Sequence, residues 1–195
     1  MVETIQDKAY AEISSVYPND TELLSAATAE GPDFADKLPY LHELGQECLR
    51  YFTVLMLSLP RTTTQPSVYN SKHIPAGTTL WLNAWACNMD SEIWDDPEVF
   101  RPERWLQRPN APFFTYGLGH RMCVGVALAN RELELVLLRV LGYFEIQSAH
   151  PQETDASPWT GSSNRSVAGG FPKHYEAYFM PRDEENLRRA LGARS

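Results

Sequence analysis

One cysteine in a glycine-spaced loop limits what this chain can fold into more than any other feature. The loop reads Phe-Phe-Thr-Tyr-Gly-Leu-Gly-His-Arg-Met-Cys-Val-Gly at residues 113–125, and a long apolar segment follows it. Gly119 and Gly125 are expected to let the backbone approach the sulfur of Cys123 without an intervening Cβ. Residues 126–141 are predicted to form a helix, which places the cysteine at a positive N-terminal end that favours a thiolate. An anionic sulfur held this way suits nucleophilic catalysis, zinc or haem iron.

Composition, net charge and cysteine count limit the kinds of fold, partner and metal site that this chain can have. With 195 residues, 43% of them hydrophobic and 22% charged, the chain can bury a sizeable core, and we expect a single domain over residues 1–195. A net charge of −8 with no basic block argues against nucleic acid as a partner. Cys48 and Cys87 are expected to be small buried hydrophobes, and an odd cysteine count without a signal peptide fits a reducing, cytoplasmic compartment. Zinc is disfavoured because no His or Cys lies at ligand spacing from Cys123.

The loop resembles the haem-binding loop of the cytochrome P450 family, the haem-thiolate monooxygenases. Gly119, Arg121, Cys123 and Gly125 fill the places of that family's pattern, while Tyr116 stands where the pattern has Phe. The resemblance implies that Cys123 is the axial thiolate ligand of haem b.

Two further motifs lie upstream in the family's order. Glu47 and Arg50 fall three residues apart on an amphipathic stretch predicted to be a helix over residues 37–55, with Asp36 as its cap. From spacing alone, such a pair reads as a solvated surface contact that contributes little to stability. By resemblance, Arg104 in Pro-Glu-Arg-Trp joins this pair in a buried triad that braces the haem-binding loop, where removal of one member would cost about 3–5 kcal/mol.

The resemblance implies a fold that is mainly α with small β-sheets, and it covers only the C-terminal portion of the family fold. Segments at 74–90, 121–133 and 178–183 are similar to fungal-type phenylacetate hydroxylases. Family members are more than twice as long, and their oxygen-binding helix, substrate-roof helices and membrane anchor have no counterpart here. A short gene product, a mis-assigned start and one piece of a split protein are all compatible with this. An anchor outside these residues would imply the endoplasmic-reticulum membrane.

The resemblance also implies an activity and its partners. The chain would insert one oxygen atom from O2 into a small aromatic or polyketide-like substrate, with electrons from an NADPH-dependent flavoprotein reductase. Arg121 and Arg61 would pair with the haem carboxylates, because a planar guanidinium matches a carboxylate, and Tyr116 would pack beside the thiolate. The alternative is a truncated, non-catalytic remnant with a haem-binding or interaction role.

A group of basic residues surrounds the cysteine loop in the sequence. It comprises Arg101, Arg104, Arg108, His120 and Arg121. Such a group either forms a basic face that attracts an acidic redox partner or consists of scattered loop arginines.

The remaining pattern predicts the order of elements. Helices are expected at 2–16, 20–28 and 184–193, with strands at 63–69 and 78–82 around a turn at 70–73. Later strands are expected at 143–146 and 175–180, separated by a polar loop from 148 to 170. The helix at 126–141 is too short and too charged to span a bilayer, so we expect it to be buried and apolar on most sides.

Overall fold

The computed structural model describes residues 4–28, 34–164 and 169–192. Its helices are α1 (Ile5–Val16), α2 (Asp20–Thr28), α3 (Phe34–Lys37), α4 (Pro39–Phe52), α5 (Ala84–Asn88), α6 (Glu103–Gln107), a 3-10 turn at Gly119–Arg121, α7 (Val126–Tyr143) and α8 (Glu184–Ala190). Its strands are β1 (Arg61–Thr62), β2 (Ser67–Tyr69), β3 (Lys72–Ile74), β4 (Thr79–Leu80), β5 (Phe144–Ser148) and β6 (Ala177–Pro181). The predicted class, mainly helical with small sheets, is confirmed.

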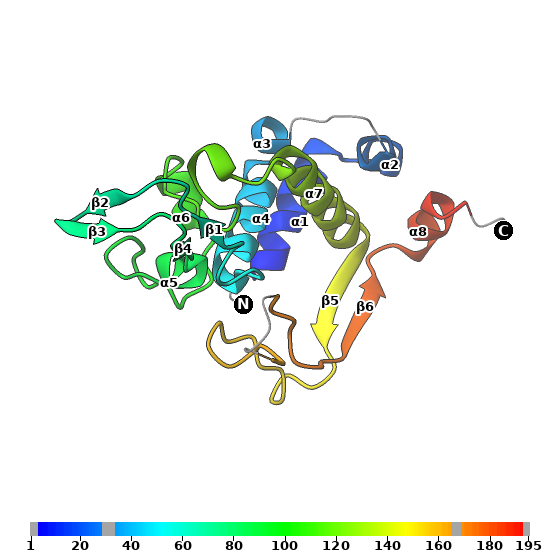
Figure 1. Ribbon diagram of the computed structural model, residues 1–195. Coiled ribbons are helices and arrows are strands. Elements are labelled where there is room, and N and C mark those ends of the chain that lie inside the picture. Colours follow the sequence, from blue (N-terminus) through cyan, green and yellow to red (C-terminus); the bar gives the residue numbers. More distant parts are fainter. Residues whose placement is uncertain (1–3, 29–33, 165–168, 193–195) are drawn as a thin grey trace.

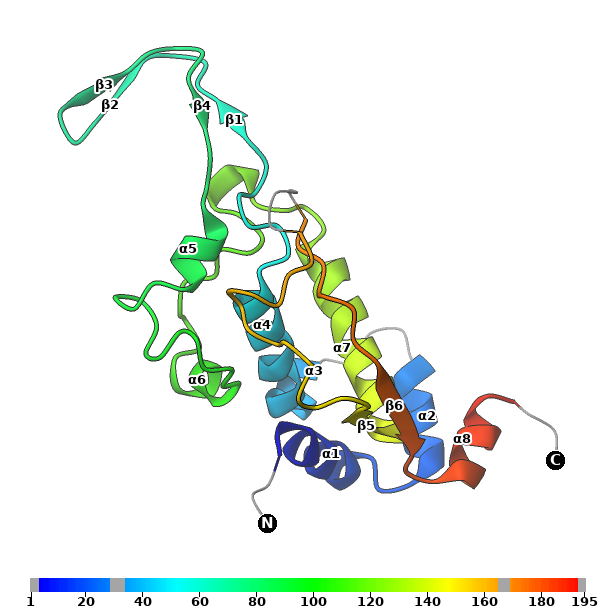
Figure 2. The same cartoon turned by 90° about the horizontal axis from the view of Figure 1, so that it is seen from below.

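The core lies where α1, α4 and α7 pack side by side (Figure 1). Ile13 of α1, Leu41 of α4 and Leu138 of α7 are each no more than 1% exposed. The helical spacing of apolar residues in each segment explains this, because each helix turns one apolar stripe toward the other two. Figure 2 shows the β2–β3 hairpin extending away from this bundle on one side and α8 lying on the other.

Helix α4 begins differently from the prediction. Asp36 is exposed and lies within the short helix α3. The N-cap position of α4 is occupied by Leu38, whose side chain makes no capping hydrogen bond. Instead, the Glu12 carboxylate of α1 accepts the N–H groups of Tyr40 at 2.8 Å and Leu41 at 2.9 Å. The first orphan donors of α4 are therefore satisfied by a neighbouring helix rather than by the preceding chain.

The strands after α4 pair in a different order from the prediction. The segment expected to pair with residues 63–69 pairs instead with β1, so that Thr62 faces Thr79. β2 pairs with β3 across a two-residue turn in which Asn70 and Ser71 have φ of 46° and 62°. This conformation matches the hairpin turns that suit twisted strands, and Asn tolerates it well. The turn is thus shorter than the predicted 70–73.

The long helix α7 differs from prediction in its burial. Only its C-terminal end is fully buried, at Leu138, Leu141 and Tyr143, whereas Leu128 and Val136 are 62% and 55% exposed. It is apolar as expected, but most residues of its N-terminal half are only partly buried. Among the residues that the structure describes, no helix is long and apolar enough to cross a membrane.

The last elements follow the prediction with shifted ends. β5 and β6 form an antiparallel pair in which Ile146 faces Phe179. The charged helix α8 begins after Asp183, whose carboxylate accepts the N–H of Asn186 at 3.0 Å. Part of the predicted 148–170 loop, residues 165–168, lies outside the described residues.

Candidate functional site

The cysteine loop ends at the N-terminus of α7, as the sequence predicts. Cys123 is exposed and lies two residues before the Gly125 N-cap, which has no side-chain cap. Its backbone N–H donates to the Tyr116 carbonyl at 2.9 Å, which closes the loop into a compact turn. The thiol group is thus presented at the positive end of an 18-residue helix.

The loop glycines act differently from the expectation. Gly119 has φ of +62°, and no atom lies within 4 Å of the position a Cβ would take, so backbone conformation rather than close approach requires glycine there. Gly117 has φ of +81° and contributes a second left-handed position. A Cβ at Gly125 would lie 3.8 Å from the Cys123 sulfur, which is an ordinary contact distance. The expected close approach to sulfur is therefore not required at either predicted glycine.

Tyr116 lies between the loop and α7. Its hydroxyl donates to the Asn130 side-chain carbonyl at 2.6 Å, and its ring meets Phe113 edge-on at 5.4 Å between centroids. Burial raises the pKa of Tyr116, and the nearby Cys123 and Glu134 charges raise it further. Tyr116 therefore has a hydroxyl that the family's Phe lacks, and this hydroxyl links the loop to α7 by a hydrogen bond.

The structure brings Glu47, Arg50 and Arg104 together in a fully packed environment. Their exposed fractions are 0%, 0% and 3%. Arg50 donates to both Glu47 oxygens at 2.8 Å, and Arg104 donates to one of them at 3.2 Å. The interpretation of the pair as a solvated surface contact is therefore wrong, because α6 brings a second arginine and the buried Trp105 over it.

Further groups complete this buried network. The Glu47 carboxylate also accepts the Trp105 indole N–H at 3.0 Å and the Arg101 backbone N–H at 2.9 Å. Arg104 donates to the carbonyls of Asp95, Asp96 and Val99, and burial lowers its pKa from the usual value, an effect that Glu47 opposes. Each charge has several partners, as a buried ionic group requires.

Two polar residues that the sequence analysis did not single out connect this network to the cysteine loop. The Arg50 guanidinium donates to the backbone carbonyl of Asn88 at 2.7 Å. The side-chain amide of Asn88 donates to Thr115 Oγ1 at 3.1 Å. Thr115 in turn donates to the Leu49 carbonyl at 2.9 Å. Because Thr115 immediately precedes Tyr116, the loop is attached to α4 through hydrogen bonds. Only the presence of small polar residues in these segments hinted at this role.

Arg61 and Arg121 flank the loop from two elements. Arg61 opens β1 and donates weakly to the Arg121 carbonyl at 3.5 Å, while Arg121 ends the 3-10 turn and is exposed. Exposed apolar side chains lie in the same loop, with Leu118, Met122 and Val124 at 52%, 54% and 105% exposure. An exposed thiol, apolar side chains and two guanidinium groups fit a flat apolar cofactor that carries carboxylates, which is the chemistry of haem.

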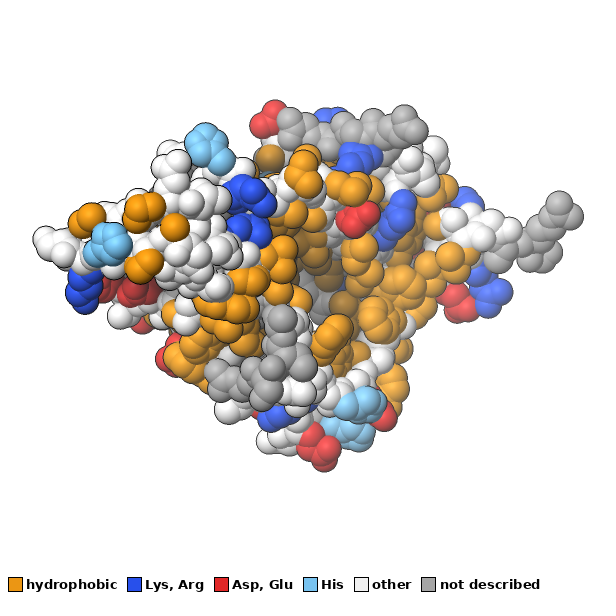
Figure 3. Space-filling model, viewed as in Figure 1, with side chains coloured by type: hydrophobic (Ala, Val, Ile, Leu, Met, Phe, Trp, Pro, Cys, Tyr) orange, Lys and Arg blue, Asp and Glu red, His pale blue; other side chains and the backbone are white. Residues whose placement is uncertain are grey.

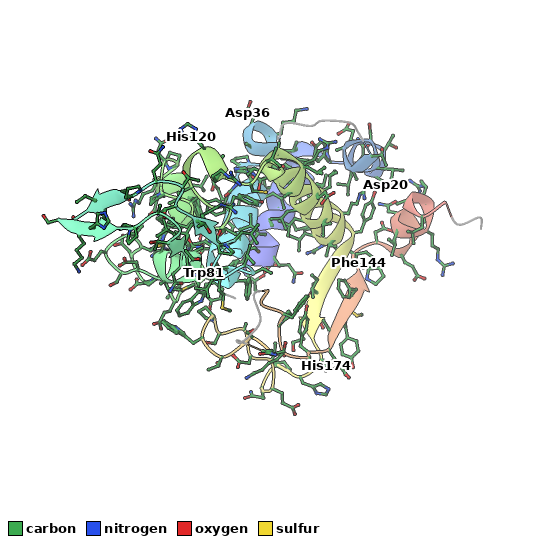
Figure 4. All side chains as sticks on the ribbon, in the orientation of Figure 1. Asp20, Asp36, Trp81, His120, Phe144 and His174 are labelled. Atoms are coloured by element: carbon green, nitrogen blue, oxygen red, sulfur yellow. The ribbon has the colours of Figure 1, made fainter. Side chains whose placement is uncertain are left out.

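The basic group expected around the loop is smaller than predicted. Arg104 is buried in the network and does not belong to any surface. Arg108 donates to the Ile93 carbonyl at 2.6 Å and lies over the Trp94 ring, but its side chain remains exposed. His120 (Figure 4) is exposed on the turn before the cysteine. Arg121 is exposed on the same turn.

A large apolar cavity lies between α4, α7 and the segment after residue 153. Its volume is about 530 Å³, and its walls include Cys48, Phe52, Leu133, Phe171 and Tyr175. Figure 3 shows hydrophobic side chains spread over this face of the molecule around a hollow. Cys48 is only partly buried, as is Cys87, so the expectation that both are buried is wrong in degree. No group of three or more His, Cys, Asp or Glu side chains suited to a metal ion occurs within the described residues.

Comparison with known proteins places this geometry in a family. The family model for cytochrome P450 matches residues 3–167. The chain is 46% identical over 187 residues to 3-hydroxyphenylacetate 6-hydroxylase of Emericella nidulans, covering 96% of this chain and 35% of that protein. It is 34% identical to phenylacetate 2-hydroxylase of the same organism, covering 95% and 36%, and 32% identical to fumitremorgin C synthase of Aspergillus fumigatus, covering 81% and 30%.

A solved structure agrees with this. A zebra fish cytochrome P450 bound to abiraterone matches with a TM-score of 0.72 at 27% identity, covering 91% of this chain and 39% of that one. The chain thus spans about a third of the length of the curated relatives that it matches.

Proposed function

The chain belongs to the cytochrome P450 family, and we propose that it forms the haem-thiolate part of a monooxygenase that hydroxylates a small aromatic molecule. The observation that carries the proposal is the exposed Cys123 thiol at the start of α7, held in a loop that a buried ionic network attaches to α4. The relatives that support it are named as hydroxylases of small aromatic acids.

The Cys123 sulfur would bind the iron of haem b, which would supply oxygen activation when bound. The residues of this chain position the sulfur. The left-handed Gly117 and Gly119 shape the turn that places the sulfur just before the start of α7.

Arg121 and Arg61 would hold the carboxylates of the cofactor. They come from the cysteine loop and from β1, so they approach from two directions. Neither guanidinium has a carboxylate partner among the described residues. A planar donor fork matches a carboxylate, and two of them would fix the orientation of the cofactor about the sulfur.

An electron donor would bind beside the same loop. His120 and Arg121 are exposed there, whereas the chain as a whole carries a net charge of −8. This local excess of positive charge would attract an acidic partner, such as an NADPH-dependent flavoprotein reductase, and would make the association sensitive to salt.

The test is haem incorporation by the purified chain. We expect a preparation expressed with haem to show, after reduction and addition of carbon monoxide, the red-shifted Soret band of a thiolate-ligated complex. Cys123→Ser should abolish that band, and Cys48→Ser, which changes a thiol within α4, should retain it. Failure of the purified chain to take up haem would overturn the proposal.

A second candidate is a non-catalytic remnant of the family. It is favoured by the exposed apolar residues of α7, Leu128 and Val136. Such a chain would bind haem weakly or not at all and would serve an interaction role. Failure of the folded chain to give the thiolate spectrum would support this candidate.

A further inference from the structure

Tyr116 bonds to the chain at Cys123 and again beyond it. Its backbone carbonyl accepts the N–H of Cys123 at 2.9 Å, and its side-chain hydroxyl donates to Asn130 Oδ1 at 2.6 Å. Asn130 lies on α7, which begins at Val126, just after the cysteine. The two hydrogen bonds therefore close a ring that contains the end of the loop, the cysteine and the first turn of α7.

The geometry of α7 places Asn130 within reach of this hydroxyl. The residue is half-buried and follows the first turn of the helix. Side chains of an α-helix point back toward its N-terminus, so the Asn130 amide extends toward the loop that precedes α7. Its oxygen is an acceptor for a hydroxyl group, which an apolar side chain of similar size could not replace.

The ring of Tyr116 is held from the opposite side by aromatic contacts. It meets Phe113 edge-on at 5.4 Å between centroids, and Phe113 meets Trp105 of α6 edge-on at 5.6 Å. The Trp105 indole N–H donates to the buried Glu47 carboxylate at 3.0 Å. The ring is thus fixed relative to α6, which leaves its hydroxyl directed at α7.

The bond to Asn130 requires a tyrosine at position 116. A phenylalanine there would keep the ring and the backbone carbonyl that binds Cys123, but it has no hydroxyl to donate to Asn130. The bond therefore adds a connection between loop and helix that the packing of an aromatic ring alone does not supply.

Few other contacts hold the cysteine in place. Cys123 is exposed, and its neighbours Met122 and Val124 are 54% and 105% exposed. Segments with few buried contacts open locally at low cost, so packing contributes little to the position of the sulfur. The ring of hydrogen bonds through Tyr116 is the connection that spans the cysteine on both sides.

We propose, on the basis of the haem-thiolate function proposed above, that Asn130 is a positioning residue for Cys123 and acts through the Tyr116 hydroxyl. Loss of this bond would let the loop move away from α7, expose the Cys123 N–H to solvent and displace the sulfur from the place where it would meet iron. Residues that orient a metal ligand without touching the metal commonly change metal affinity or activity by about 10- to 100-fold when replaced.

The first test uses the haem-free chain labelled with 15N at its three cysteines. Asn130→Leu and Tyr116→Phe should each speed hydrogen exchange at the Cys123 amide by about fivefold, the effect of losing one hydrogen bond. The double variant should exchange no faster than either single variant, because both substitutions remove the same bond. The amides of Cys48 in α4 and Cys87 in α5 should be unaffected.

Two further variants are the matched controls. Asn130→Asp keeps an acceptor oxygen at the same position and should retain slow exchange at Cys123. Tyr178→Phe removes a hydroxyl from an exposed tyrosine of β6 and should leave the Cys123 amide unchanged. Exchange at Cys123 that stays slow in Asn130→Leu, or that accelerates equally at all three cysteines, would overturn the proposal.

The second test uses the haem-loaded chain. After reduction and addition of carbon monoxide, the red-shifted Soret band should decay about tenfold faster in Asn130→Leu than in the unaltered chain, and Asn130→Asp should restore its lifetime. An equal lifetime in Asn130→Leu would overturn the role of Asn130. Absence of haem uptake by the unaltered chain would instead overturn the proposed function, and the exchange rates of the haem-free chain would still decide whether Asn130 positions Cys123.

Discussion

Glu47 is the residue on which the buried network depends. Its carboxylate receives donors from Arg50, Arg104, Trp105 and the Arg101 backbone. Its charge offsets those of two buried guanidinium groups, and its removal would leave them uncompensated. Desolvation makes such a loss far more costly than the loss of a surface pair.

Replacement of this carboxylate by its amide tests that argument. Glu47→Gln should lower the free energy of unfolding by about 3–5 kcal/mol, measured by urea denaturation. Glu184→Gln is the matched control, because its pair with Arg188 is 69% exposed on both sides and should change stability by about 0.5 kcal/mol or less. Similar losses in the two variants would contradict the importance of burial.

The cysteines should differ sharply in reactivity. Burial, with a smaller contribution from the Glu47 charge, raises the pKa of Cys48 from 9.0 to about 12, whereas Cys123 is exposed. At pH 8 the three-unit shift leaves Cys48 about a thousandfold less thiolate than an ordinary thiol. Mass spectrometry after iodoacetamide treatment should therefore find Cys123 labelled first and Cys48 labelled at an ordinary rate only in urea.

The sign of the pH effect follows from the same shift. The unfolded chain ionises this thiol above about pH 9, while the folded chain resists ionisation until about pH 12. Stability should therefore fall as the pH rises through that window. Equal labelling rates for Cys48 and Cys123 in the native chain would contradict the raised pKa.

At the scale of elements, the sequence predicts that Asp36 caps the start of α4, whereas in the structure Glu12 of α1 accepts hydrogen bonds there. Glu12→Ala should lower the free energy of unfolding by about 1–2 kcal/mol, because two N–H groups lose a charged acceptor at a helix N-terminus. Asp36→Ala, which removes the carboxylate that sequence spacing favours, should have little effect because Asp36 is exposed. Thermal melts of both variants provide the measurement. A larger loss of stability in Asp36→Ala than in Glu12→Ala would show that Asp36 caps the helix, as the sequence predicts.

The same element shows why periodicity predicts some features and not others. The ranges of α1, α4 and α7 follow from apolar spacing, since each helix buries its own stripe. The cap of α4 comes from Glu12, 28 residues away from Tyr40, so no local pattern could reveal it. The strands β1 to β4 have two or three residues each, which is too short for alternation to fix their pairing.

Only part of the cysteine loop and its buried network could be predicted from the sequence, because some of their contacts join segments that are far apart along the chain. The resemblance to the cytochrome P450 family predicts that Glu47, Arg50 and Arg104 meet, whereas their spacing alone does not. The apolar segment after Gly125 predicts that Cys123 lies ahead of a helix. The bridge through Asn88 and Thr115 depends on where α5 and the loop meet in space. Buried hydrogen-bond partners of this kind follow from packing rather than from spacing along the chain.

At the scale of the whole molecule, apolar surface is spread over more than one element. Leu128 and Val136 of α7 are 62% and 55% exposed. Tyr178 and Phe179 of β6 are 61% and 53% exposed, and as neighbours in a strand they point to opposite faces of the β5–β6 pair. Figure 3 shows hydrophobic side chains gathered over one face of the molecule. Exposed apolar surface of this extent favours association with other apolar surfaces.

We therefore expect the isolated chain to self-associate through this face. Sedimentation velocity should show an average sedimentation coefficient that rises with protein concentration, because each buried apolar Å² contributes about 25 cal/mol. Leu128→Gln combined with Val136→Gln should reduce this rise, since residues eight apart lie near one another on a helix face. Val68→Gln is the matched control, because Val68 is 69% exposed but lies on the separate β2–β3 hairpin. Sedimentation independent of concentration in the unaltered chain would show that the exposed face does not drive association.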